Sequence, residues 1–504
     1  MAYPSMPLSL ALVNRVQRQQ TRARQDPFAA AYVTSSIEIS PMSRVWQWAL
    51  VATGAAIVIF QLFVPPILGV ADNGDFPKLS RHACIGPLDP ARYPLFDYYT
   101  PRYAIRSQYC GSIMATSAVI PLYISLAPAG WFLPRGEYDL RFLGALYALL
   151  FLGAFFLFLR LVSQPPLVAM FALVVFFSAA YVPIFSTFYM DTAALIFLLW
   201  SVVLGIHVLS SRRVGLGAFA SLTAALLFLA TSKVQHSLEA LCFVPLFWFR
   251  FERKAFPAVW ARAAASVVVI AGSLVFLATS SPWYRAISFY DSLFFKFLPA
   301  SENPAAALAK LGLDASFVQY IGRHSYSPGT HMQEEPYAIA FGKQVTLTKM
   351  LRFLLVNPKV VASAMRHDLE EGSLERVRME IGAREYRLGN YQPESGHLPE
   401  AQSHVLALWP AAKAALYARR PWSYLGFCFT LVALLWLAAW FQGPARAPAV
   451  LGVAVLTALL PTTFAPPFFD AVDTGRHLFL FNCVLDLCAC TLLALAIRLA
   501  KPRP

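Results

Sequence analysis

The sequence predicts an all-α polytopic membrane protein with a bundle of about ten transmembrane helices, and three observations carry this prediction. Of the 504 residues, 58% are hydrophobic and only 13% are charged, which is about half the charged share of a soluble domain. Apolar runs of about 20 residues, long enough to cross a bilayer, recur along the chain. The 41 Lys and Arg residues outnumber the 27 Asp and Glu residues. The basic residues gather in alternate connections between the runs, as expected of cytoplasmic loops in a membrane protein. The excess of positive charge therefore does not indicate nucleic-acid binding.

Ten apolar runs are candidate spans, two of them short unless they extend into their flanks. They cover residues 46–70, 141–159, 166–183, 191–209, 215–230, 237–249, 263–279, 422–441, 447–464 and 478–497. A further apolar run, 111–131, is interrupted by Pro121 and Pro128. A full crossing by this run would turn every later basic connection outward, so we expect it to be re-entrant, interfacial or one of a compensating pair. Ten spans place both termini in the cytoplasm.

This map divides the chain into four parts. Residues 1–45 form a cytoplasmic arm, and residues 46–280 form a transmembrane domain whose first outside loop, 71–140, is expected to be catalytic. Residues 281–421 form a second extracytoplasmic segment, and 422–504 hold the last spans and a short cytoplasmic tail. In the second segment we expect helices over 303–314 and 346–371. The latter mixes apolar and basic residues, which suits a helix lying on the membrane surface.

Two of the seven cysteines, Cys84 and Cys110, fall in the first outside loop. A disulfide between them is compatible with an oxidising compartment, and two free thiols are the alternative. The other cysteines lie in predicted spans, where a thiol is a small apolar filler.

Acidic residues follow the first span and open the fourth. Asp72 and Asp75 flank Gly74, which permits a tight turn. They are either solvated acids at a helix exit or catalytic carboxylates held at the membrane surface. Asp191 is either a helix N-cap or an acid that orients a substrate or helps to bind a metal.

Basic residues occur at two other outer turns. Lys233 precedes His236 and Glu239, which share a face if this stretch is helical. A snorkelling lysine and one satisfied buried Glu are the alternative reading, and a single His-x-x-Glu is weak evidence for a metal site. Arg476 and His477 open the last span against the positive-inside trend.

For the turn at Arg476 and His477, the alternative to a functional role is a surface ion pair between Asp473 and Arg476. If the four clusters meet, their carboxylates suit general-base chemistry, and their cations suit a phosphate. Arginine can grip a phosphate with two parallel hydrogen bonds, and lysine acts on it as a point charge.

The layout resembles the GT-C fold of membrane glycosyltransferases that use polyprenyl-phosphate sugars. The resemblance rests on the acidic motif after the first span, the acid in a later outside turn and the large external segment before the last spans. The stretch 73–77 (Asn-Gly-Asp-Phe-Pro) and the turns 231–236 and 475–477 resemble those of bacterial glycan-biosynthesis hexose transferases. The Trp-Trp-Asp-type motif of oligosaccharyltransferases is missing, which disfavours transfer to protein asparagine.

The resemblance implies an enzyme of the bacterial inner membrane whose active site faces the periplasm or cell exterior. The donor would be a polyprenyl-phosphate hexose embedded among membrane lipids, and the acceptor a glycan or a lipid-linked saccharide. Asp75, with Asp72 as second choice, would be the general base for an inverting displacement. Lys233 and Arg476 would stabilise the leaving phosphate, with His236 and His477 as hydrogen-bond donors. No cofactor is certain, and a divalent cation (Mg²⁺ or Mn²⁺) at Asp191 stays open.

Three other classes remain. A transporter or flippase would line a path near the bilayer midplane with polar groups. A polysaccharide polymerase or ligase would share the lipid-linked substrates, and would tolerate replacement of both Asp72 and Asp75. In a non-enzymatic scaffold the same motifs would be ordinary surface turns.

Overall fold

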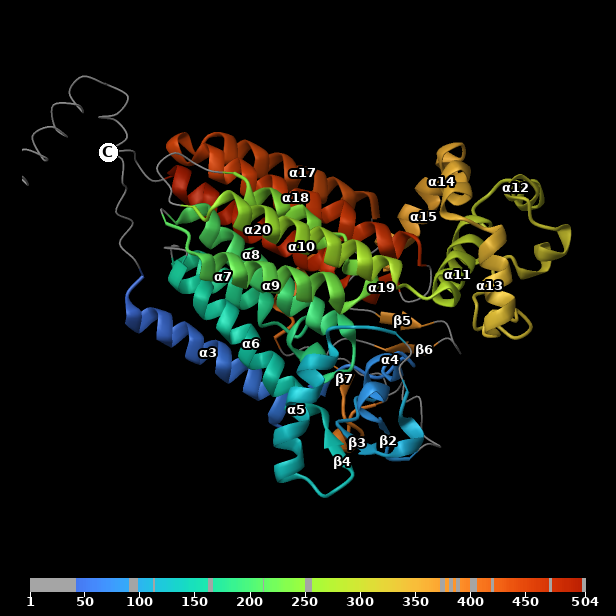
Figure 1. Cartoon of the computed structure of the whole chain (residues 1–504), viewed down its shortest axis with the longest axis horizontal. Helices are drawn as coiled ribbons and strands as arrows, with labels where there is room; N and C mark the ends of the chain where they lie inside the picture. Colours follow the sequence, from blue (N-terminus) through green and yellow to red (C-terminus); the bar gives the residue numbers. More distant parts are fainter. Residues whose placement is uncertain are drawn as a thin grey trace, which may run out of the picture.

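The computed structural model describes residues 42–89, 98–111, 114–161, 166–211, 213–249, 256–371, 377–379, 384–386, 390–398, 406–417, 421–470 and 474–500. Seven helices in this part of the chain are long and apolar enough to cross a membrane. They are α3 (Arg44–Phe63), α6 (Leu140–Leu161), α8 (Met190–Ser210), α10 (Val259–Ala278), α17 (Pro421–Trp440), α18 (Arg446–Phe468) and α20 (Phe479–Ala500). They form one bundle, in which α3 begins at the end where α20 finishes (Figure 1). The predicted all-α polytopic class is confirmed.

Four further apolar helices are shorter than these seven. They are α5 (Val119–Phe132), α7 (Pro166–Phe176), α9 (Leu216–Ser232) and a 3₁₀ helix, Glu239–Phe247. The predicted spans 166–183, 215–230 and 237–249 correspond to the last three of these. The first predicted span, 46–70, extends too far, because α3 ends at Phe63. Pro65 and Pro66 have no backbone N–H with which to continue a helix, and the next residues form the short strand β1 (Leu68–Gly69).

The loop 71–140, predicted to lie outside, folds into a small module at one end of the bundle. Its helix α4 (Pro77–Ser80) and 3₁₀ turn Arg81–Ala83 lead into an antiparallel sheet, β2 (Ile85–Pro87), β3 (Arg102–Ile105) and β4 (Glu137–Asp139), with a 3₁₀ turn at Ser107–Tyr109. Strand β1 pairs with β7 (Asn390–Tyr391), far along the chain. Cys84 and Cys110 are joined in a disulfide, which links the end of the turn Arg81–Ala83 to the end of the turn Ser107–Tyr109.

Residues 282–371 form a separate helical body, here called the outer lobe, to the right of the bundle in Figure 1. It consists of α11 (Pro282–Tyr290), a π-helix (Asp291–Phe297), α12 (Pro304–Leu311), a 3₁₀ helix (Ala315–Tyr320), α13 (Glu335–Gln344), α14 (Leu347–Leu355) and α15 (Pro358–Glu371). It has a hydrophobic core of its own. The helix expected over 303–314 is α12, which Asn303 caps through a hydrogen bond from the Ala306 amide. The helix expected over 346–371 is two helices, because Pro358 begins the second.

The chain returns from the outer lobe through short elements. These are the strand pair β5 (Val377–Met379) and β6 (Arg384–Tyr386), the 3₁₀ turn Pro393–Ser395, and α16 (Leu408–Tyr417). Helix α16 lies against the bundle: Trp409 packs edge-on against Phe171 of α7, 5.2 Å between ring centroids. The Lys413 Nζ atom is 2.9 Å from both carboxylate oxygens of Asp486 in α20. This contact within the segment 281–421 has no counterpart in the sequence prediction.

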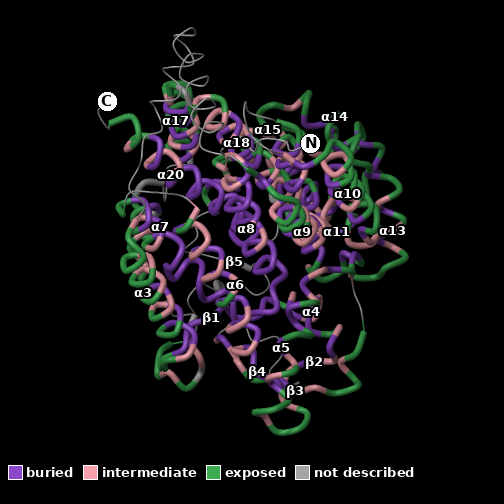
Figure 2. The backbone as a smooth tube through the Cα atoms, turned by 60° about the vertical axis from the view of Figure 1, so that its left-hand side comes forward, coloured by how far each residue is buried: buried purple, intermediate pink, exposed green. Residues whose placement is uncertain are grey.

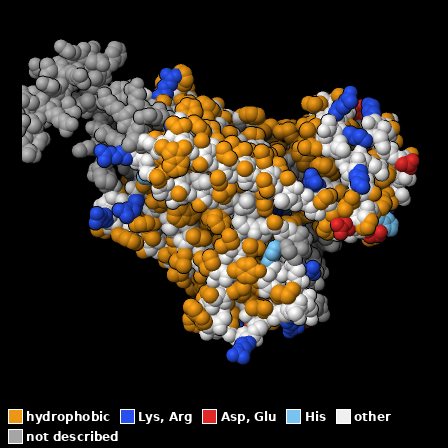
Figure 3. Space-filling view, viewed as in Figure 1, with side chains coloured by type: hydrophobic (Ala, Val, Ile, Leu, Met, Phe, Trp, Pro, Cys, Tyr) orange, Lys and Arg blue, Asp and Glu red, His pale blue; other side chains and the backbone are white. Residues whose placement is uncertain are grey.

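The centre of the bundle is α8, which is buried along most of its length (Figure 2). The flank of the bundle seen in Figure 3 is covered by hydrophobic side chains. In the same view Lys and Arg lie both at the end near the C-terminus and at the opposite end, including the outer lobe, and Asp and Glu are seen on the outer lobe. A hydrophobic flank between two polar ends is the surface expected of a protein that spans a membrane.

Candidate active site

A rigid acidic turn follows β1 and carries Asp75. Gly74 has φ +95°, a conformation that favours glycine. One oxygen of Asp72 accepts hydrogen bonds from the amides of Gly74 (2.8 Å) and Phe76 (3.1 Å). The Asn73 side chain accepts one from the Asp75 amide, at 3.1 Å. These bonds make Asp72 and Asn73 supports of the turn, so that the Asp75 carboxylate is fixed in place.

Two cations from different parts of the chain hold Asp75. Lys78, one turn later in α4, has its Nζ 2.6 Å from Oδ1 of Asp75. Arg476, in the short helix α19 (Thr474–His477), donates from Nη2 to Oδ2 at 2.5 Å. The guanidinium also lies over the Tyr189 ring, 4.6 Å from its centroid. The hydroxyl of Tyr189 in turn donates to the Ala71 carbonyl and accepts from the Asn73 amide, so one tyrosine supports both the acid and the cation.

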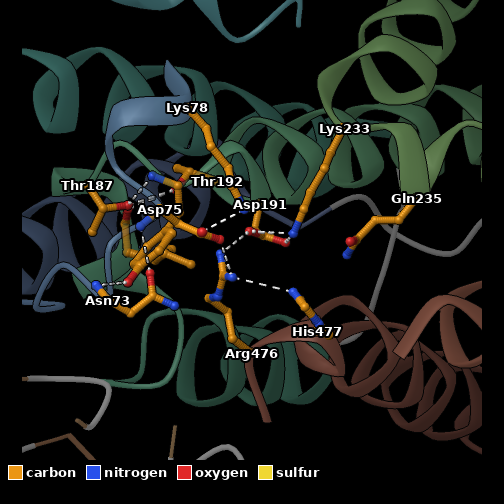
Figure 4. A network of polar contacts seen from close by, with 12 residues as sticks. Asn73, Asp75, Lys78, Thr187, Asp191, Thr192, Lys233, Gln235, Arg476 and His477 are labelled. Carbon is orange, nitrogen blue, oxygen red and sulfur yellow. Dashed lines mark hydrogen bonds and ion pairs between the residues drawn. The ribbon is translucent and has the colours of Figure 1, made fainter. Parts of the chain in front are cut away.

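The second carboxylate, Asp191, stands between two cations (Figure 4). Lys233 Nζ is 3.0 Å from Oδ1 and 3.2 Å from Oδ2, and Arg476 Nη1 is 3.4 Å from Oδ2. Asp191 lies in the first turn of α8, whose N-cap is Tyr189, so its carboxylate serves the ion pairs and is not the cap. All three charged side chains are at least 95% buried. A buried cluster of this kind is stable only while the charges remain paired.

The two histidines lie behind these charges. The ring of His236 is between Glu239, 2.7 Å from Nδ1, and Asp191, 3.6 Å from Nε2. Having a carboxylate at each nitrogen favours the doubly protonated ring. His477 places Nε2 3.4 Å from Arg476 Nη2 and Nδ1 3.3 Å from Asp470. Each ring therefore bridges two charged groups: His236 lies between Glu239 and Asp191, and His477 lies between Arg476 and Asp470.

The charges of the cluster set its protonation states. Burial alone raises the pKa of Asp75, but Lys78, Arg476 and Lys233 outweigh it and hold that pKa well below its ordinary value. Burial, together with Lys233 and Arg476, keeps the pKa of His477 well below its ordinary value, so the ring is neutral at pH 7. Burial raises the pKa of Asp470 to about 6 against the opposing charges of nearby cations. At neutral pH the site thus presents an ionised Asp75 surrounded by cations.

The structure brings most of the predicted site residues together. Asp75, Asp191, Lys233, His236, Arg476 and His477 form one connected network, drawn from four stretches of chain. Asp72 is buried and stabilises the turn that carries Asp75 by accepting hydrogen bonds from the amides of Gly74 and Phe76. Asp473 lies outside the described residues, while Arg476 is buried and pairs with Asp75 and Asp191. In the described part of the chain no group of three or more His, Cys, Asp and Glu side chains is arranged to hold a metal ion.

Three members of the network were not assigned from the sequence. Lys78 stands three residues after Asp75, a spacing that brings two side chains together on a helical turn and could have signalled the pair. Tyr189 and Asp470 carry no comparable signal. Their roles depend on the start of α8 and the end of α18 reaching the same end of the bundle.

The fold and the site define a polytopic α-helical membrane protein with a paired-charge centre at one end of its bundle. Residues 38–501 match the family model described as the YfdI N-terminal transmembrane domain, so the chain belongs to this family of GT-C-like membrane proteins. No curated protein and no solved structure matches the chain significantly.

Proposed function

We propose that this protein is an inverting membrane glycosyltransferase. It would transfer a hexose from a polyprenyl-phosphate donor to a glycan or lipid-linked acceptor on the extracytoplasmic side of the bacterial inner membrane. The observation that carries the proposal is the meeting of two carboxylates and three cations at one end of an apolar bundle. The GT-C-like family supports the same class of reaction.

The donor phosphate would occupy the cationic side of the cluster. Arg476 and Lys233 both contact Asp191, so this carboxylate holds the two cations next to each other. The phosphate carries growing negative charge as its bond to the anomeric carbon breaks. Cations fixed in place before the reaction stabilise that charge without having to reorganise.

Asp75 would accept the proton of the acceptor hydroxyl. The hydroxyl oxygen forms a bond to the anomeric carbon, the bond from that carbon to the phosphate oxygen breaks, and the proton passes to Asp75. A carboxylate bound by two cations is a weak base, but a phosphate that draws Arg476 away would raise the pKa of Asp75. Donor binding would thus activate the base. One base and a separate phosphate clamp give a single displacement with inversion.

The test uses full-length protein in lipid vesicles with radiolabelled polyprenyl-phosphate glucose, galactose or mannose and an extract of cell-envelope glycans. Transfer is measured as label moving from the organic phase to the glycan fraction. Asp75→Asn should lower turnover by about 10²–10⁴-fold, the range for loss of a general base. Asp89→Asn, an exposed acid in the same loop, is the matched control and should retain full turnover.

Full turnover by Asp75→Asn would remove the base from this scheme. Full turnover by the Asp72→Asn and Asp75→Asn variants alike would favour the polymerase or ligase class.

A further inference from the structure

Helix α14 of the outer lobe has two apolar faces. One face is buried in the core of the lobe and consists of Met350, Phe353 and Leu354. The other face is exposed and carries a row of leucines that recur every four residues, Leu347, Leu351 and Leu355. Leu355 is 82% exposed, and the next residue, Val356, is 66% exposed. A contiguous row of large apolar side chains on a surface marks a site of interaction with a partner or a membrane.

The residues around this row are basic. From residue 336 to residue 367 the chain has no Asp or Glu, and its charged side chains are all exposed and positive: Lys343, Lys349, Arg352, Lys359 and Arg366. Lys359 and Arg366 pair with acids outside this stretch, Glu302 and Glu370. Arg352 stands on α14 itself, directly after Leu351. Leucines beside basic residues suit the surface of an anionic bilayer, which offers acyl chains below a layer of phosphates.

Helix α14 also lies near the ends of two spanning helices. The next helix, α15, packs against α17 and α18 of the bundle as well as against α14 (Figure 1). Lys296 of the lobe donates to the carbonyl of Phe468, the last residue of α18. The surface of a bilayer is expected where spanning helices end, so we expect α14 near the level of that surface.

Helix α15 does not share the exposed apolar surface. Its apolar residues Val360, Ala364 and Leu369 are buried. The membrane-surface helix that the sequence predicts over 346–371 is therefore narrowed to its first part, α14.

We propose that α14 binds the surface of an anionic phospholipid bilayer. The leucine row would enter the boundary between the headgroups and the acyl chains, and Arg352 would contact lipid phosphates. A second copy of this chain fits the surface less well, because two such faces would bring like charges together. The inference does not depend on the proposed glycosyl transfer, since it concerns how the outer lobe is held on the membrane.

The test places a fluorophore on the leucine row of the full-length protein. Leu351→Cys and Leu355→Cys are labelled with a polarity-sensitive maleimide dye in nanodiscs of phosphatidylcholine and phosphatidylglycerol, with and without nitroxide on the acyl chains. We expect the nitroxide to quench about half of the emission or more, because an interfacial helix buries its apolar face about 5–10 Å deep. Glu335→Cys, at the exposed start of α13, is the matched control and should keep its emission. The wild-type chain, labelled in parallel, measures the signal of the native cysteines.

Three results would overturn the proposal. The first is equal quenching in Leu355→Cys and Glu335→Cys. The second is protection of the dye from both the nitroxide lipids and aqueous iodide, which would show that protein covers the row. The third is equal quenching in nanodiscs of phosphatidylcholine alone, where the attraction of the basic residues to anionic lipid is lost and quenching should weaken. Because the assay uses neither donor nor acceptor, its outcome is separate from that of the proposed transfer.

Discussion

Arg476 is the residue on which the candidate site depends most. Its guanidinium spans Asp75 and Asp191 with two different nitrogens, so one side chain joins the proposed base to the proposed phosphate clamp. A lysine ammonium is a single point and cannot reproduce a fork that contacts two carboxylates at once.

We predict that Arg476→Lys lowers kcat by about 10²–10³-fold, comparable with removal of one fixed donor to a developing anion. The loss should appear in kcat more than in the KM for the acceptor, because the arginine acts on the leaving group. Steady-state kinetics with each substrate varied would measure it. Arg285→Lys, on the exposed side of α11, is the control, and an Arg476→Lys enzyme as active as this control would contradict the role.

Asp291 makes the stability of the outer lobe depend on pH. Burial, reinforced by the charge of Asp470, raises the pKa of Asp291 to about 8, although Ser325 donates to it. The folded protein therefore binds a proton that the unfolded chain releases near pH 4, and stability falls as the pH rises from about 4 to 8.

Asp291→Asn should flatten this dependence, since the amide is neutral at every pH and can still meet Ser325. Thermal unfolding in detergent at pH 6 and pH 8.5 would measure the effect. The melting temperature of the variant, relative to that of the wild type, should be higher at pH 8.5 than at pH 6. Asp314→Asn, an exposed acid in the same lobe, should leave the wild-type pH profile unchanged. A wild-type melting temperature that rises over this range would contradict the assignment.

At the scale of elements, a buried ion pair between the π-helix and α15 of the outer lobe lies next to the end of α18. Lys296 Nζ is 2.6 Å from Asp368, and the two side chains are 1% and 0% exposed. The ammonium also donates to the carbonyls of Phe468 and Asp470, at the end of α18. The pair thus joins the lobe to the end of α18, which precedes α19 and Arg476 in the sequence.

We predict that Lys296→Met destabilises the protein by about 3–5 kcal/mol, because it leaves Asp368 as an uncompensated buried charge. The double variant Lys296→Met/Asp368→Leu should recover most of that loss. Lys359→Met is the matched control, since its partner Glu302 and Lys359 itself are 78% and 83% exposed, and such a pair contributes about 0–1 kcal/mol. Unfolding in detergent would rank the variants, and equal effects at the two lysines would contradict the prediction.

At the scale of the whole molecule, the network lies at the end of the bundle away from the start of α3 and the end of α20 (Figure 1). The basic connections predicted to be cytoplasmic include the turn at Arg213, which separates α8 from α9. If they are cytoplasmic, the disulfide module, the site and the outer lobe all face the oxidising side.

A topology reporter fused after Arg213 should therefore score as cytoplasmic, and one inserted after Ala300 as external. In intact cells Cys84 and Cys110 should resist alkylation until a reductant is added. An external score at Arg213 would invert the whole map, and ready alkylation of both thiols in the native protein would argue against the disulfide.

Much of the site was predictable because polar residues are costly at the rim of a membrane domain. Asp75, Asp191, Lys233 and Arg476 stand out in apolar surroundings, and so could be chosen without knowing what they contact. Lys413 and Asp486 show the limit of this reasoning. One lies in a segment expected to be outside and the other deep in a span, and nothing local in either stretch indicates the partner.

Hydrophobic length and charge asymmetry are local properties of the chain, so the membrane class, the approximate helices and the clusters of charge could be predicted from the residues alone. The folded structure alone shows which charges pair, that Asp72 supports the turn that carries Asp75, and that Tyr284 contacts Lys78. Those facts depend on where α4, α8, α11 and α19 end relative to one another. Packing between segments hundreds of residues apart sets that geometry, and no local pattern encodes it.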